Sequence, residues 1–298
     1  MENNLLLKGI MPALVSPVNE DYTVREDVTR RLVEWQLSKG CTGFYVCGGT
    51  GEGVVMQPDA RKKMAEIVVD QTAGRGKVVV HIGAIDLKTT IELAQHAEKI
   101  GADVISSVPP LYYNYSFEEK YNYYKAISDN CGLPILMYAS PMAGAPMTVE
   151  QIDRVMDIPT MIGLKWTNPD MYALQQIKTL RGGNITVING PDEMLSCGLI
   201  MGADGGIGST YNCMPGTVVS LYNAFQAGNI PEVQRIQRKM NAFIKLMIKH
   251  TVIPACKATL EYQGFDVGNA TYPMKALSAE EKAVLYAELK EIGFDEYE

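Results

Sequence analysis

The short apolar segment from Met161 to Trp166 carries a lysine where its strand-like character ends, and this residue is Lys165. Desolvating an ammonium group is unfavourable unless the amine is neutral or paired, so a lysine at this place needs a reason. A neutral amine in an apolar pocket can attack a ketone, and the resulting imine lets a neighbouring C–C bond break or form without a metal. A snorkelling side chain or half of an ion pair is the commoner explanation of such a position taken alone.

Other polar residues follow other strand-like segments at equivalent places. A glycine-rich turn offers closely spaced N–H groups for an anion, and a phenol can move protons. Each residue also has a structural explanation, since tyrosines are common in cores, and Thr, Ser and Asp are common where helices begin. The set comprises Gly49-Thr50-Gly51, Tyr138, Gly190, Asp192, Glu193 and Ser209.

The spacing of apolar segments predicts the elements that position these residues. Eight short strand-like segments alternate with helical patterns, most of which close on glycine, as helix ends favour. Strict alternation predicts parallel strands joined by right-handed crossovers. Eight units favour an α/β protein with a (β/α)8 TIM barrel over an open doubly wound sheet. The expected strands are 9–15, 43–47, 78–82, 103–107, 135–138, 161–165, 185–189 and 205–208.

The rest of the chain reads as helices, which gives the barrel a C-terminal helical extension. We expect residues 1–298 to form a single domain, with a barrel core over 1–214 and with the closing barrel helix and C-terminal helices over 215–298. In such a barrel, the carboxyl ends of all the strands face one pocket. The candidate residues therefore converge only if the barrel prediction is right.

Composition limits the possible partners. The 298 residues are 47% hydrophobic and carry a net charge of −7, which disfavours nucleic acid and anionic membranes as partners. No secretory signal begins the sequence, and no apolar run reaches the roughly 18 residues of a membrane span. Six scattered cysteines favour reduced thiols in the cytoplasm, and three dispersed histidines argue against a metal site.

Three motifs resemble those of the N-acetylneuraminate lyase and dihydrodipicolinate synthase superfamily. They are Gly48-Gly49-Thr50-Gly51-Glu52, Tyr138 with Pro141 three residues later, and Gly163-Leu164-Lys165. The resemblance implies a barrel-shaped class I aldolase, typically a homotetramer, that uses no cofactor beyond a covalent imine on Lys165. It further implies that Tyr138 assists proton transfer and that Gly49 and Thr50 hold the substrate carboxylate.

Further residues are similar to those of the sialic acid lyase branch. The resemblance implies that Gly190, Asp192, Glu193 and Ser209 bind the polyol tail of an open-chain sialic acid. It places Thr167 near the reacting carbinol, and it implies that Tyr112 reaches the site of a neighbouring subunit. The synthase branch normally carries an arginine where this chain has Ala143, and the loop 140–146 is about one residue shorter than in the lyases.

The expected function is the reversible cleavage of N-acetylneuraminate to N-acetylmannosamine and pyruvate, with these small molecules as the only partners besides the chain's own copies. A 2-keto-3-deoxy sugar acid aldolase and a dihydrodipicolinate synthase-like enzyme are the alternatives within the same chemistry. A keto-acid-binding protein without catalysis is the alternative outside it, and the presence of both Lys165 and Tyr138 argues against it.

Overall fold

A computed structural model describes residues 7–141, 144 and 146–298. All eight strands are parallel and follow the order β1-β8-β7-β6-β5-β4-β3-β2. The circle closes between β1 and β2, because Leu14 N donates to Tyr45 O at 2.9 Å and Thr42 N donates to Ile10 O at 2.9 Å. The predicted barrel is confirmed. Its strands are β1 Gly9–Pro12, β2 Gly43–Val46, β3 Lys77–His81, β4 Val104–Ser107, β5 Ile135–Ala139, β6 Met161–Trp166, β7 Thr186–Asn189 and β8 Gly205–Gly208.

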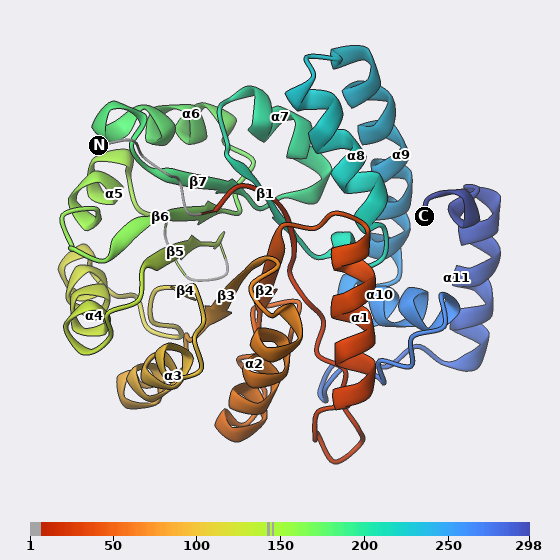
Figure 1. Ribbon diagram of the computed structural model, residues 1–298, viewed down its shortest axis with the longest axis horizontal. Helices are drawn as coiled ribbons and strands as arrows, with labels where there is room; N and C mark the ends of the chain where they lie inside the picture. The colour runs from red at the N-terminus through yellow and green to blue at the C-terminus, as the bar shows by residue number, and fades with distance from the viewer. Residues whose placement is uncertain (1–6, 142–143, 145) are drawn as a thin grey trace.

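Helices surround the strands and extend beyond them (Figure 1). The surrounding helices are α1 Glu26–Ser38, α2 Pro58–Thr72, α3 Leu87–Lys99, α4 Phe117–Asn130, α5 Val149–Val155, α6 Met171–Thr179, α7 Leu195–Ile200 and α8 Pro215–Gln226. Three further helices lie on the side of the barrel near α8 and α1 (Figure 1). They are α9 Ile230–Lys249, α10 Val252–Tyr262 and α11 Ala279–Glu291. Short 3-10 turns cover Leu180–Gly183, Asp192–Met194, Thr210–Asn212 and Phe294–Glu296. Within the described ranges, no helix is both long and apolar enough to cross a membrane.

Two separate apolar clusters reveal which strand residues face inward. Alternate residues of a strand point to opposite faces of the sheet. The strands of a barrel therefore contribute side chains to one cluster inside the barrel and to another beneath the helices. The inner cluster takes Met11, Tyr45, Val79, Leu136, Tyr138 and Ile188. The outer cluster takes the strand neighbours Ile10, Phe44, Val78, Ile135 and Val187 together with many helix residues.

An irregularity in β6 determines which way Lys165 points. Simple alternation from the inward Ile162 would place Leu164 inside and Lys165 outside. The pairing of β5 with β6 skips one residue, however, because Ile135 pairs with Met161 and Leu136 pairs with Gly163. This bulge reverses the phase, so that Leu164 joins the outer cluster and Lys165 turns inward. Only glycine fits at the bulge, since a Cβ on Gly163 would lie 1.9 Å from Thr186 O.

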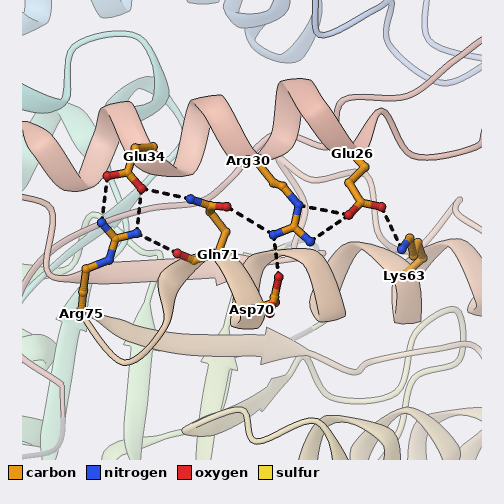
Figure 2. A network of polar contacts seen from close by, with 7 residues as sticks. All are labelled: Glu26, Arg30, Glu34, Lys63, Asp70, Gln71 and Arg75. Atoms are coloured by element: carbon orange, nitrogen blue, oxygen red, sulfur yellow. Dashed lines mark hydrogen bonds and ion pairs between the residues drawn. The ribbon is translucent and has the colours of Figure 1, made fainter.

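A network of charged side chains joins α1 to α2 on the outer surface (Figure 2). Arg75 binds Glu34 through two hydrogen bonds of 2.8 and 2.7 Å, and Arg30 bridges Glu26 and Asp70. The hydrogen bonds from Arg75 and then from Gln71 lower the pKa of Glu34 to about 2. Because exposed ion pairs stabilise proteins little, we expect this network to contribute little to the stability of the fold.

Candidate active site

Lys165 lies buried inside the barrel near the carboxyl end of β6. Its side chain is 5% exposed, and its Nζ lies 4.1 Å from the centre of the Tyr138 ring and 5.4 Å from that of Tyr45. Tyr138 is the partner of Lys165 in the pairing of β5 with β6. No carboxylate among the described residues forms an ion pair with Lys165. The explanation of Lys165 as a snorkelling or salt-bridged lysine is therefore excluded, and a buried amine beside a phenol remains.

The surroundings of the Tyr138 phenol change its pKa. Burial opposes ionisation, but the positive charge of Lys165, hydrogen bonding to Lys165, and the Thr167 and Ser140 side chains together lower the pKa of Tyr138 below its ordinary value. Thr167 Oγ1 itself makes no hydrogen bond of ordinary geometry within the described part of the chain. Thr167 Oγ1 therefore lies beside the phenol, and among the described residues its interaction with Tyr138 is the one that acts on a pKa.

The turn after β2 has the properties of an anion site. In the described structure, the backbone N–H groups of Gly49, Thr50 and Gly51 donate no hydrogen bond, whereas those of Glu52 and Gly53 donate to Gly49 O and Gly48 O at 3.0 Å each. Three consecutive free N–H groups can bind a carboxylate. The hydroxyls of Thr50 and Ser209 lie 2.6 Å apart, which brings the turn next to the residues after β8.

The residues after β7 place a buried carboxylate at the same end of the barrel. Asp192 is 7% exposed, and its Oδ2 accepts hydrogen bonds from Thr210 N at 2.8 Å and Thr210 Oγ1 at 2.7 Å. Gly190 lies against Thr167, since a Cβ there would lie 2.0 Å from Thr167 Oγ1. Glu193 is exposed, and its carbonyl accepts from Asn241 Nδ2 at 3.3 Å. Asp192 and Glu193 therefore place two carboxyl groups after β7, one buried and one exposed.

Asp192 provides a stability test that does not depend on activity. Burial raises its pKa from 3.8 to about 6, although the Thr210 hydrogen bonds and Lys165 act in the opposite direction. An acid with a raised folded-state pKa binds more protons when folded, so its contribution to stability falls as pH rises from about 4 to 6. Asp192→Asn keeps both Thr210 bonds but cannot ionise. We expect the variant to gain up to about 3 kcal/mol relative to the wild type between pH 4 and pH 7, measured by urea unfolding.

Parallel stability curves for the wild type and Asp192→Asn would contradict this expectation, because they would mean that Asp192 ionises as readily in the folded as in the unfolded chain. Asp170→Asn is the matched control, since Asp170 is an exposed helix cap that accepts from Ala173 N at 2.9 Å. The control should change stability little, because asparagine is also a good N-cap residue, and it should show no comparable gain over the same pH range.

Tyr112 and Trp166 lie apart from this group of residues. The Tyr112 side chain is 88% exposed and touches Tyr113, with 5.0 Å between ring centres. Nothing in the described structure connects Tyr112 to Lys165 of the same subunit. The Trp166 ring belongs to the outer cluster, and its Nε1 donates to Asp170 O at 3.1 Å, so it does not face Lys165. Ala143, which distinguishes this chain from the synthase pattern, lies outside the described residues.

Three buried polar residues, Tyr45, His81 and Arg61, were not predicted as site residues. Tyr45 faces Lys165, and its hydroxyl lies 2.9 Å from Ser106 Oγ. Burial, and then the charge of Arg61, lower the pKa of His81 to about 3, so this ring is neutral. The Arg61 guanidinium donates to His81 O at 2.7 Å and to Gly83 O at 2.9 Å. Strand alternation could have identified Tyr45, but nothing local in the sequence points to Arg61.

Comparisons with known proteins find a family and several related enzymes. A family model described as the dihydrodipicolinate synthetase family matches residues 6–292. An N-acetylneuraminate lyase of Shigella boydii is 37% identical over 258 residues, which cover 86% of this chain and 86% of that protein. The solved N-acetylneuraminate lyase of Proteus mirabilis has a TM-score of 0.92 and 30% identity, covering 97% of this chain and 99% of that one. A catalytic lysine mutant of the Ruminococcus gnavus sialic acid aldolase has a TM-score of 0.93 and 27% identity over 100% of both chains.

Proposed function

The chain belongs to the dihydrodipicolinate synthetase family, and on that premise we propose that it is a class I aldolase that reversibly cleaves N-acetylneuraminate to N-acetylmannosamine and pyruvate. The observation that carries the proposal is the buried Lys165 amine, held 4.1 Å from the centre of the Tyr138 ring and not paired with any described carboxylate. The related Ruminococcus gnavus aldolase, which has a catalytic lysine, supports this assignment.

Binding begins at the carboxylate of the open-chain acid. The free N–H groups of Gly49 and Thr50, with the Thr50 hydroxyl, receive this carboxylate, which directs C2 of the substrate toward Lys165. The polyol tail extends toward the acceptors after β7 and β8. We assign Thr167, Gly190, Asp192, Glu193 and Ser209 to this tail and to the reacting carbinol.

Cleavage then follows from the pair of Lys165 and Tyr138. The amine attacks the C2 ketone, and loss of water gives a protonated imine. The Tyr138 phenolate accepts the C4 hydroxyl proton, the C3–C4 bond breaks, and its electrons move into the imine as an enamine. N-Acetylmannosamine leaves as the aldehyde. The phenol returns its proton to C3, and water hydrolyses the imine to pyruvate and free Lys165.

We also propose a quaternary state and a location. A homotetramer in the cytoplasm fits the family resemblance, and it would explain the exposed Tyr112, which could then act in the site of a neighbouring subunit. The reaction should need no metal or organic cofactor, because the imine nitrogen supplies the electron sink. Full activity in the presence of a chelator is the expected result.

Substrate preference is the direct test of this proposal. The release of pyruvate is monitored by a coupled lactate dehydrogenase assay. It is measured with N-acetylneuraminate as the substrate and, separately, with 2-keto-3-deoxygluconate. We expect the larger kcat/KM with N-acetylneuraminate, because its long polyol can use the acceptors around Asp192. A preference for the shorter acid would move the assignment to the alternative aldolase, and no release from either substrate would refute the proposed class.

A further inference from the structure

A fully buried ion pair lies directly behind the turn that receives the carboxylate. Glu52 Oε1 and Lys257 Nζ are 2.6 Å apart, and their side chains are 0% and 2% exposed. The pair joins distant parts of the chain, since Glu52 follows Gly51 and Lys257 lies on α10. Lys257 Nζ also donates to Asn269 O at 2.9 Å, and Glu52 Oε2 accepts from Thr271 N.

Stability alone does not explain this arrangement. Removing two charges from water is unfavourable, and well-packed apolar residues of similar volume often stabilise a fold as well or better. Glu52 also adopts a left-handed backbone with φ of 57°, a conformation that non-glycine residues adopt only with strain. Both features occur within two residues of Thr50, where the geometry of the turn matters for binding.

We propose that Glu52 and Lys257 are positioning residues that set the carboxylate-binding turn, an inference that rests on the proposed aldolase function. The pair fixes the end of the turn to α10 and to the segment 269–271. It thereby keeps the N–H groups of Gly49, Thr50 and Gly51 directed at the ligand. Lys257 also neutralises Glu52, whose carboxylate would otherwise repel an anionic substrate through the buried protein.

The pair can be removed without leaving an unpaired charge. Glu52→Gln/Lys257→Met retains an acceptor for Thr271 N and replaces the lysine with an apolar side chain of similar length. Such a replacement should leave the melting temperature close to that of the wild type, whereas Lys257→Met alone would bury an uncompensated Glu52. The double variant is compared with the wild type in steady-state kinetics of cleavage and of synthesis.

The expected result is selective for ligands with a carboxylate. KM for N-acetylneuraminate and the inhibition constant of pyruvate should rise about tenfold, which corresponds to about 1.4 kcal/mol. KM for N-acetylmannosamine at saturating pyruvate should stay within about twofold, since this sugar has no carboxylate, and kcat should change less than KM. If the pair had only a structural role, its removal would change the constants for the acid and for the neutral sugar to a similar extent.

Unchanged constants for pyruvate in a folded double variant would overturn the proposal, and so would equal increases for the acid and the neutral sugar. If the double variant does not fold, Glu52→Asp serves as the test, because it keeps both charges but shortens the side chain that fixes the turn; a rise in the pyruvate constant is expected, and no change would contradict the proposal. Reductive trapping of pyruvate on the wild-type protein tests the proposed aldolase function independently of the role proposed for Glu52 and Lys257. An adduct on Lys165 leaves the aldolase assignment standing whatever the variants show.

Discussion

Replacement of Lys165 by alanine should reduce the cleavage of N-acetylneuraminate by roughly 10⁴-fold or more, since the variant cannot form the covalent imine. Substrate binding should persist, because the carboxylate turn and the acceptors around Asp192 do not depend on the amine. Removing a buried amine with no paired carboxylate should leave the folded state at least as stable as before. The measurements are kcat from pyruvate release and the melting temperature of the same preparation.

A matched control is Lys125→Ala, which removes an exposed lysine paired with Asp129 on α4. This variant should retain wild-type kinetics. Activity of Lys165→Ala within about tenfold of the wild type would show that the reaction does not pass through an imine on this residue.

Tyr138→Phe should lower kcat by about 10²- to 10⁴-fold, the usual contribution of a general acid or base. The expected loss is large because this phenol both accepts the C4 proton and returns one to C3. The lowered pKa of Tyr138 adds a pH signature. Cleavage needs the phenolate, so the rate of the wild type should rise with pH through an apparent pKa below the ordinary phenol value of about 10. That rise should vanish in Tyr138→Phe.

Tyr124→Phe is the appropriate control, because Tyr124 is also buried and its hydroxyl donates to Ser107 O at 2.9 Å. This variant should lose about 1 kcal/mol of stability and little activity. Tyr138→Phe should still trap pyruvate on Lys165, although it cleaves sialic acid poorly. A wild-type pH profile retained in Tyr138→Phe would assign the proton transfer to another group.

The barrel itself could be predicted because each of its units carries a complete local signal. Strand-like runs and helical periodicity repeat eight times, most of the helices close on glycine, and this regularity predicts both the fold class and the strand direction. Boundaries were less accurate. The expected first strand, 9–15, is observed as Gly9–Pro12, and the expected sixth strand, 161–165, is observed as Met161–Trp166. Local patterns do not show where a ladder of hydrogen bonds ends.

The orientation of Lys165 shows what the sequence pattern leaves undetermined. The position of Lys165 at the end of a strand suggested a catalytic role. Strict alternation along the strand would have pointed its side chain outward, and the bulge at Gly163 instead points it toward Tyr138. The pairing of Glu52 with Lys257 was equally hidden, since it depends on how α10 packs against the turn after β2. Contacts between distant segments leave no local signal in a single sequence.

Reductive trapping tests the central claim most directly. The protein is incubated with pyruvate and borohydride, digested, and its peptides are examined by mass spectrometry. The proposed mechanism predicts a three-carbon adduct on Lys165, absent without borohydride and absent in Lys165→Ala. No adduct, or an adduct on a different lysine that persists in Lys165→Ala, would contradict the role of Lys165 as the imine-forming nucleophile.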